Sequence, residues 1–249
     1  MKDPKEIPTL VDLIKTCADK KDIHEGERLH AQIREKGFLE KSPHLFTSLI
    51  DMYAKLGILR KAQEVHDELP IRDLDTWNAL IRGYSRQGRG YEAWNCFLGM
   101  QIEGLSPDVV TFICLSKACG SIGNVDKGKL LHEEILRRGL LEKHIALGNA
   151  LVDMYAKCGM LEKASHMVNE LPSRTIASWN TLISAYTQQG QAYEALNCFK
   201  RMERDGLSPN AITFVCTLKA CGSIGAIGKG KEIHNEIIRR RLLENNIVL

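Results

Sequence analysis

Eight cysteines are the residues of this chain that could most readily bind a metal or carry redox chemistry. No two of them have the C-x-x-C spacing typical of such sites, and the nearest approach is C-x4-C at Cys114 and Cys119. Seven of the eight recur at matching places in a repeating pattern, so we expect them to fill core space as small hydrophobic residues. The sequence therefore predicts no metal site and no cofactor, and free thiols fit a reducing compartment.

Three H-x-E strings match half of the zinc deaminase signature, in which a histidine ligates zinc and the glutamate transfers protons. They begin at His66, His132 and His234. The signature also requires P-C-x-x-C, which follows none of them, and there is no H-E-x-x-H or Walker motif. These strings are predicted to be scaffold residues, and no enzymatic activity is expected of this chain.

The composition excludes further classes. Hydrophobic residues make up 44% of the 249 residues, which is ordinary for a folded protein. No apolar run approaches the length of about 18 residues that a transmembrane helix needs. The first residues are neither a signal peptide nor a transit peptide. The net charge of +3 is well short of a nonspecific nucleic-acid binder, so any such binding must depend on where the charges lie.

An internal repeat dominates the sequence. The segment WNALIRGYSRQGRGYEAWNCFLGMQIEGLSPD, from Trp77, matches WNTLISAYTQQGQAYEALNCFKRMERDGLSPN, from Trp179, at an offset of 102 residues. The same offset relates LIDMYAKLG to LVDMYAKCG and TFICLSKACGSIG to TFVCTLKACGSIG. A fixed period of this kind is the signature of a repeat architecture.

Each period divides into helical hairpins. Apolar residues follow a helical spacing, as at Leu80, Ile81 and Tyr84, and helix-ending glycines recur, as at Gly88 and Gly190. The pattern predicts a helix, a tight turn, a second helix and a short loop every 31 to 36 residues. One hairpin cannot bury its own apolar face, so neighbouring hairpins must stack.

The strings GNALVDMYAKCG, SWNTLISAY, KACGSIG, GKEIH and EGLSPD resemble the pentatricopeptide repeat (PPR) family, and within it the land-plant class with alternating P, L and S repeats. The resemblance covers essentially the whole chain. It implies an all-α, right-handed α-solenoid of about seven helix-turn-helix repeats, cut from a longer array with further terminal domains. The expected repeats are L at 7–42, 109–144 and 211–246, S at 43–73 and 145–175, and P at 74–108 and 176–210.

The resemblance also implies a way to read single-stranded RNA. In this family the fifth and the last residue of a repeat bracket one base, a code-like readout. The expected pairs, with the base that the family's pairings imply, are Thr47/Asp73 for G, Asn78/Asp108 for U, Asn149/Thr175 for a pyrimidine and Asn180/Asn210 for C.

The chemistry of the last residue of each pair agrees with these base assignments. A carboxylate only accepts hydrogen bonds, whereas an amide also donates, and uracil offers N3–H where cytosine offers a bare N3. The L repeats differ, because Val11, Ile113 and Val215 stand at their fifth position and cannot hydrogen-bond a base; they are expected to be spacers or weak readers. The expected site is 5′-N-G-U-N-Y-C-N-3′.

Two further sets of residues are expected to contact RNA. The second residue of a repeat is usually aliphatic in this family and sandwiches the base, and the residues here that fit are Val110, Ala146, Ala177 and Ile212. The ninth residue of each L repeat is a lysine, about 40° around the helix from the fifth. These lysines are candidate phosphate contacts: Lys15, Lys117 and Lys219.

Two functions remain open. In the first, the array is the RNA-binding part of a factor for C-to-U RNA editing. The family then implies a mitochondrial or chloroplast location for the full-length protein. Alternatively, the groove binds a peptide or a partner editing protein; a groove lined with aromatic residues would favour this. No membrane association is expected. The apolar helix faces at the two ends of a truncated array are expected to allow end-to-end self-association.

Overall fold

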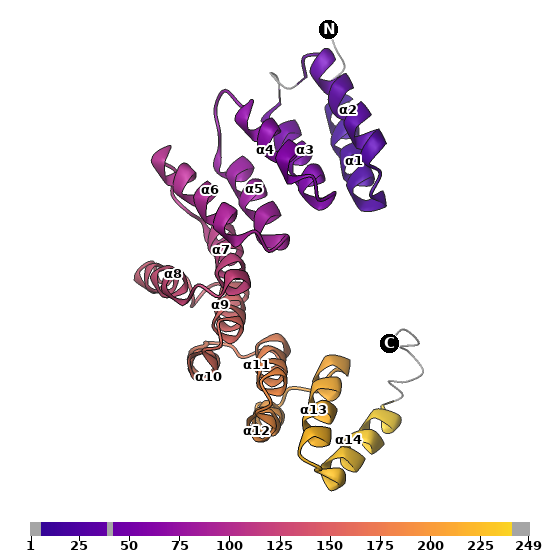
Figure 1. The fold of residues 1–249 in the computed structure, drawn as a ribbon, viewed down its shortest axis with the longest axis vertical. Helices are drawn as coiled ribbons and strands as arrows, with labels where there is room; N and C mark the ends of the chain where they lie inside the picture. Colours follow the sequence, from indigo (N-terminus) through magenta and orange to yellow (C-terminus); the bar gives the residue numbers. More distant parts are fainter. Residues whose placement is uncertain (1–5, 39–41, 241–249) are drawn as a thin grey trace. The chain divides into compact units, whose positions relative to one another are not determined.

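The computed structural model describes residues 6–38 and 42–240, and every regular element in them is an α-helix, so the all-α expectation is confirmed (Figure 1). The helices belong to two compact units, residues 1–122 and 123–249. Unit 1 contains α1 (Glu6–Lys20), α2 (Ile23–Glu35), α3 (Pro43–Lys55), α4 (Leu59–Asp67), α5 (Leu74–Arg86), α6 (Gly90–Ile102) and α7 (Val109–Ile122). Unit 2 contains α8 (Val125–Arg137), α9 (Ile145–Lys157), α10 (Leu161–Glu170), α11 (Ile176–Gln188), α12 (Ala192–Arg204), α13 (Ala211–Ser223) and α14 (Ile227–Arg239).

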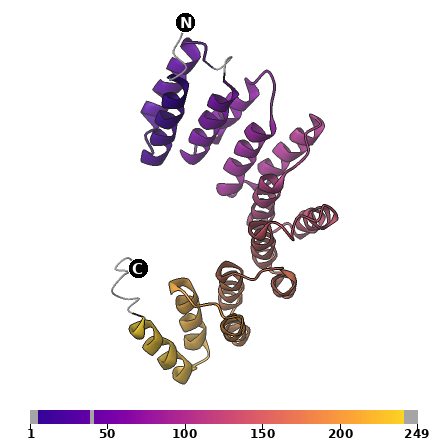
Figure 2. The same ribbon diagram turned by 180° about the vertical axis from the view of Figure 1, so that it is seen from behind.

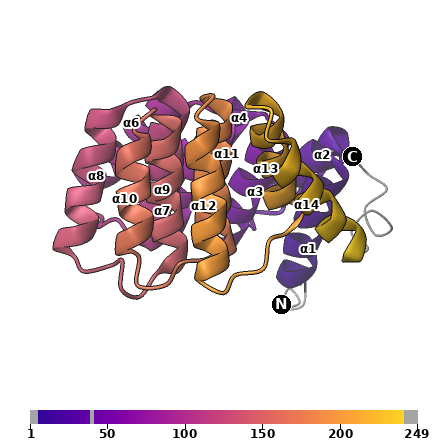
Figure 3. The ribbon, with the colours of Figure 1, turned by 90° about the horizontal axis from the view of Figure 1, so that it is seen from below.

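Each unit has two layers of helices. In unit 1, α1, α3, α5 and α7 contact one another in succession, and α2, α4 and α6 each pack against their predecessor in the chain (Figures 1 and 2). In unit 2, α9, α11 and α13 form the corresponding succession, with α10, α12 and α14 packed against them (Figure 3). The first helices of successive hairpins therefore lie side by side within a unit.

The first helices begin with a recurring cap. The side chains of Asp73, Thr175 and Asn210 each accept the backbone N–H of the residue three positions later, at the start of α5, α11 and α13. This satisfies one of the amide groups that a helix N-terminus leaves without a partner. The same residues are the last residues of expected repeats, so the loop that ends one hairpin also starts the next.

Tight turns join the two helices of a hairpin. Gly88 has φ +72° and Gly190 φ +73°, the left-handed conformation that glycine adopts without strain after a helix C-terminus. In the core, Trp77 and Trp179 are 7% and 1% exposed, and their indole N–H groups donate to Glu103 at 2.8 Å and Asp205 at 3.0 Å. In the described residues, no helix is both long enough and apolar enough to cross a membrane.

Candidate nucleic-acid interface

The pair Asn78 and Asp108 is joined by a hydrogen bond, and Thr111 of the next hairpin bonds to both residues. Asn78 Nδ2, on α5, donates to Asp108 Oδ1 at 3.1 Å. Thr111 at the start of α7 completes the network: its backbone N–H donates to Asp108 Oδ1 at 2.8 Å, and its hydroxyl lies 2.6 Å from Asn78 Oδ1. The hydroxyl is also 2.8 Å from Asp108 Oδ1. Because a hydroxyl has one proton and Asp108 Oδ1 already accepts two N–H groups, we assign the hydroxyl proton to Asn78.

The same network recurs 102 residues later in unit 2. Asn180 Nδ2 donates to Asn210 Oδ1 at 3.0 Å, and Thr213 donates its backbone N–H to that oxygen at 3.1 Å. The Thr213 hydroxyl lies 2.7 Å from Asn180 Oδ1 and accepts the backbone N–H of Asn210 at 3.1 Å. Two copies of one arrangement, with different residues at the last position, are thus present in one chain.

The helix cap orients the last residue of each pair. Asn210 Oδ1 is engaged by the α13 N-terminus, so its amide Nδ2 remains for another partner. Asp108 Oδ1 is engaged by α7 in the same way, and the atom that remains is the carboxylate oxygen Oδ2. One pair therefore presents a hydrogen-bond donor where the other presents an acceptor.

Burial separates the two members of each pair. Asn78 and Asn180 are only 4% and 8% exposed, whereas Asp108 is half-buried and Asn210 is exposed. The fifth residue was expected to face the RNA, but the structure places most of its amide against the neighbouring hairpin, where it is held by hydrogen bonds. The accessible polar edge of each pair belongs mainly to the last residue.

The other two pairs are less complete. Asn149 Nδ2 lies 3.4 Å from Thr175 Oγ1, and Asn149 Oδ1 is buried with no hydrogen-bond partner in the described part of the chain. Ser178, at the place of Thr111 and Thr213, donates instead to the Thr175 carbonyl at 2.8 Å. Thr47 is half-buried on α3, and Asp73 caps α5 through Thr76.

The candidate base-sandwiching residues are on the surface. Val110 is 41% and Ile212 59% exposed, and both alanines, Ala146 and Ala177, are exposed. In unit 2 the first helices α9, α11 and α13 line a groove of about 850 Å³ that contains Ala177, Asn180, Asn210 and Ile212. None of the residues that line it is aromatic. The structure thus brings two predicted reading residues and two predicted sandwiching residues to one surface.

The repeats expected to be of the L type lack this arrangement. Val11, Ile113 and Val215 are half-buried on α1, α7 and α13. The last residues Ser42 and His144 make no side-chain cap to α3 and α9, in contrast to the last residues of the reading pairs. Asn246, the last residue of the third L repeat, lies outside the described residues.

The candidate phosphate-binding lysines are exposed on first helices, Lys15 on α1, Lys117 on α7 and Lys219 on α13. Two other lysines on the first helices have acidic partners: Lys55 contacts Asp19 at 3.2 Å, and Lys157 contacts Asp153 at 2.7 Å.

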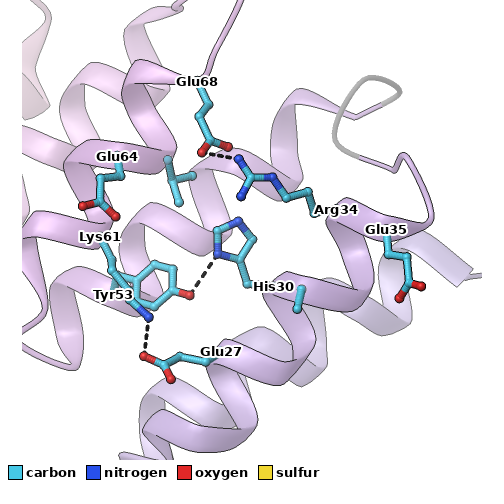
Figure 4. A pocket seen from close by; sticks show the side chains of 10 residues that line it. Glu27, His30, Arg34, Glu35, Tyr53, Lys61, Glu64 and Glu68 are labelled. Atoms are coloured by element: carbon cyan, nitrogen blue, oxygen red, sulfur yellow. Dashed lines mark hydrogen bonds and ion pairs between the residues drawn. The ribbon is translucent and has the colours of Figure 1, made fainter.

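A second pocket of about 430 Å³ lies between α2, α3 and α4 (Figure 4). His30 Nδ1 and the Tyr53 hydroxyl are 2.9 Å apart, and the ion pairs Lys61–Glu27 and Arg34–Glu68 cross it. Burial raises the pKa of Tyr53 to about 12, so the phenol stays protonated. His132 and Tyr155 repeat the contact in unit 2 at 2.9 Å. These groups join neighbouring hairpins to each other.

The cysteines have the character of packing residues. Six of the eight are buried, and burial raises the pKa of Cys96 to about 12 and of Cys198 to about 11. Their thiols are therefore protonated at neutral pH and poor metal ligands. Within the described residues, no three His, Cys, Asp or Glu side chains are placed to hold a metal ion.

Sequence reasoning missed Thr111 and Thr213. Both are 0% exposed, and both join the two members of a reading pair. The sequence signal was present, because a threonine stands three residues after Asp108 and after Asn210. This spacing was open to interpretation as a helix cap, but its link to the preceding asparagine requires the stacking of two hairpins.

Comparison with known proteins identifies the repeats. A model of the PPR repeat family matches residues 72–121 and 174–223, and a PPR repeat model matches residues 44–74, 110–140 and 149–176, which together exceed half of the chain.

Several Arabidopsis thaliana proteins are similar over most of this chain. The mitochondrial pentatricopeptide repeat-containing protein At1g06140 is 34% identical over 92% of the chain and 41% of its own length. The corresponding values are 35%, 97% and 29% for At4g33990, and 35%, 87% and 33% for the chloroplastic protein CRR2. The chain spans less than half the length of each of these relatives.

A solved structure has the same fold. The crystal structure of the pentatricopeptide repeat protein PPR10 from maize superposes with a TM-score of 0.76 at 23% identity, over 95% of this chain and 34% of the maize chain. The likeness covers both units, and at this identity it concerns the fold alone.

Proposed function

Because the chain belongs to the pentatricopeptide repeat family, we propose that it binds single-stranded RNA and reads about one base per reading repeat. The observation that carries the proposal is the network at Asn78/Asp108 and its copy at Asn180/Asn210. The fifth and last side chains of one repeat are held together, with a threonine of the next repeat, beside exposed aliphatic residues. A site of this kind combines a polar edge with an apolar surface, as recognition of an unstacked base requires.

The cap geometry supports different bases at the two pairs. Asp108 offers a free carboxylate oxygen, which accepts a hydrogen bond from uracil N3–H. Asn210 offers amide N–H groups, which donate to cytosine N3. We therefore propose U at Asn78/Asp108 and C at Asn180/Asn210.

The remaining assignments follow the family's pairings. We propose G at Thr47/Asp73 and a pyrimidine at Asn149/Thr175, with the L repeats as spacers. The division into repeats at residues 7–42, 43–73, 74–108, 109–144, 145–175, 176–210 and 211–246 is part of this proposal. The proposed site is 5′-N-G-U-N-Y-C-N-3′, flanked by phosphate contacts from Lys15, Lys117 and Lys219.

The wider role is also a proposal. The alternation of P, L and S repeats suggests a specificity subunit of C-to-U RNA editing, without catalytic residues in this chain. Relatives named mitochondrial and chloroplastic support an organellar location for the full-length protein. Contacts with other editing proteins and end-to-end self-association belong to the same hypothesis.

RNA is favoured over a peptide as the ligand. The groove over α9, α11 and α13 has amide, hydroxyl and small aliphatic side chains and lacks aromatic residues, which a peptide-binding groove would offer as anchors.

Fluorescence anisotropy tests the proposal. A labelled RNA containing GUNYC is compared with the same RNA carrying A in place of the proposed U and C, at two salt concentrations. Tighter binding of the first RNA, by about 30-fold, is expected, since the second RNA loses two base contacts and each lost contact costs about 1 kcal/mol. Equal and strongly salt-sensitive binding of both RNAs would leave only phosphate contacts. Absence of binding to either would favour the protein-partner hypothesis.

A further inference from the structure

We propose that Thr111 and Thr213 are positioning residues for base reading: each hydroxyl holds the asparagine of the preceding repeat in the one amide orientation that suits its pair. This inference rests on the proposed function. Both threonines are 0% exposed and lie under the pair, so they cannot contact a base themselves. They act through Asn78 and Asn180.

The orientation of the amide depends on two contacts. Asn180 Oδ1 faces the Thr213 hydroxyl at 2.7 Å, and Nδ2 faces Asn210 Oδ1 at 3.0 Å. Rotating the amide by 180° would place its oxygen against Asn210 Oδ1, two acceptors without a proton between them. In the first copy the repulsion would be greater, because Asp108 is a carboxylate. The threonine supplies the attractive contact at the other end of the amide.

A natural comparison lies within the chain. At Asn149 the equivalent residue is Ser178, whose hydroxyl is 2.8 Å from the carbonyl oxygen of Thr175. In the described residues, Asn149 Oδ1 is buried without a hydrogen-bond partner. Asn149 thus has no hydroxyl beside its Oδ1. Its other contact, from Nδ2 to Thr175 Oγ1, is also long at 3.4 Å. The complete network occurs where this hydroxyl faces the oxygen of the preceding asparagine, as at Thr111 and Thr213, and not where it turns to the preceding carbonyl, as at Ser178.

The network also links reading to the stacking of hairpins. Thr213 belongs to the hairpin of α13, whereas Asn180 belongs to α11. Thr213 also accepts the N–H of Asn210 at 3.1 Å, so one hydroxyl fixes both members of the pair. The geometry of the base contact in each P-type repeat therefore depends on the third residue of the next repeat, which is Thr111 or Thr213.

The substitution Thr213→Val tests this role. Valine keeps the shape and apolar contacts of threonine and removes the hydroxyl, so Asn180 Oδ1 and the backbone N–H of Asn210 both lose this partner, whereas the cap from Asn210 Oδ1 to the backbone N–H of residue 213 is retained. Anisotropy with RNAs that carry C, U, A or G opposite Asn180/Asn210 measures discrimination. The preference for C is expected to fall by about 3- to 10-fold, the value of one hydrogen bond between neutral groups. Thr213→Ser keeps the hydroxyl and is expected to restore the preference.

Thr217→Val is the matched control. Thr217 is on the same helix, is also 0% exposed, and donates its hydroxyl to the Thr213 carbonyl at 2.6 Å, with no contact to the reading pair. It should leave the preference for C unchanged. Equal loss of preference in Thr213→Val and Thr217→Val, or wild-type preference in Thr213→Val, would overturn the positioning role. A wild-type chain without any base preference would overturn the proposed function, and the positioning role with it.

A measurement without RNA gives a second readout. The side-chain NH2 signals of Asn180 in the free protein report how firmly the amide is held. Thr213→Val is expected to speed hydrogen exchange of this NH2 group at least severalfold, and Thr217→Val is expected to leave it unchanged. Unchanged exchange in Thr213→Val, with the fold intact by circular dichroism, would contradict the assigned contact.

Discussion

At the scale of single residues, the central finding is that the reading pairs are bonded to each other before any ligand is present. Asn78 and Asn180 are buried, and both Oδ1 and Nδ2 of each side chain are hydrogen-bonded. A preorganised pair loses little conformational entropy on binding, which favours affinity and discrimination. Under the proposed function, the last residue is expected to decide the base, because it alone differs between the two pairs.

Exchanging the last residues should therefore exchange the bases. We expect Asp108→Asn to shift the preference of its repeat from U toward C, and Asn210→Asp to shift the other from C toward U, each by about 1 kcal/mol or roughly fivefold. The caps persist, because both residues accept the backbone N–H through Oδ1. Anisotropy with RNAs that differ only at these two positions measures the shift. If both variants bind more weakly but keep their original preference, the last residue does not read the base.

At the scale of helices, one feature serves stability and recognition together. Asp73, Thr175 and Asn210 cap a first helix while ending an expected repeat, so the cap fixes the side chain at the edge of the groove. Most of the buried side chains are apolar. His66 is an exception: it is 1% exposed between α4 and α5, stacks edge-on against Trp77, and neither ring nitrogen has a hydrogen-bond partner in the described residues.

This histidine should make stability depend on pH. Burial lowers the pKa of His66, and the nearby Arg72 lowers it further. The unfolded chain therefore binds a proton at about pH 6.5 while the folded chain does not, so stability is lost as the pH falls below about 6.5. His66→Val introduces the residue found at the equivalent position 168, and we expect it to reduce the loss of thermal stability between pH 7 and pH 5.5.

Thermal melting followed by circular dichroism at the two pH values measures this effect. His44→Ala, which removes an exposed histidine from α3, is the control and should keep the wild-type loss. His30 and His132 also have pKa values lowered by burial, so part of the acid sensitivity will remain in His66→Val. An unchanged pH dependence in His66→Val would show that this histidine does not titrate on unfolding.

At the scale of the whole chain, the weak net charge of +3 makes the position of each lysine matter. Lys219 lies on a first helix, on the layer that lines the groove in unit 2, whereas Lys200 is exposed on the second helix α12. Only a lysine near the RNA backbone releases counterions on binding.

Lys219→Ala should therefore weaken binding of matched and mismatched RNA alike and lower the slope of log K against log salt by roughly 0.7, the value for one phosphate contact on a single strand. Lys200→Ala carries the same change of charge and should have little effect. A titration of salt with each variant decides the point. Equal slopes for Lys219→Ala and the wild type would exclude a phosphate contact at this position.

The repeat pattern, the helical class and the candidate base-reading pairs could be predicted from the sequence. The 102-residue offset, the helical apolar spacing and the helix-ending glycines can be recognised in the sequence alone, because none of them depends on which side chains come into contact in the fold. Asn78 and Asp108 were identified because they occupy repeated positions. Their hydrogen bond was not foreseen, since position in a repeat says nothing about which atoms meet.

The contacts that hold each pair depend on the packing of helices against one another and could not be predicted from the sequence. Asn78, Asp108 and Thr111 are brought together by the packing of α5 against α7, and that packing buries the fifth residue, which sequence reasoning had placed toward the RNA. The same packing separates Ser178 from Asn149, although serine and threonine offer the same hydroxyl group. Contacts between hairpins depend on the distance and rotation of whole helices, and these are set by the sum of the core side chains rather than by any local string.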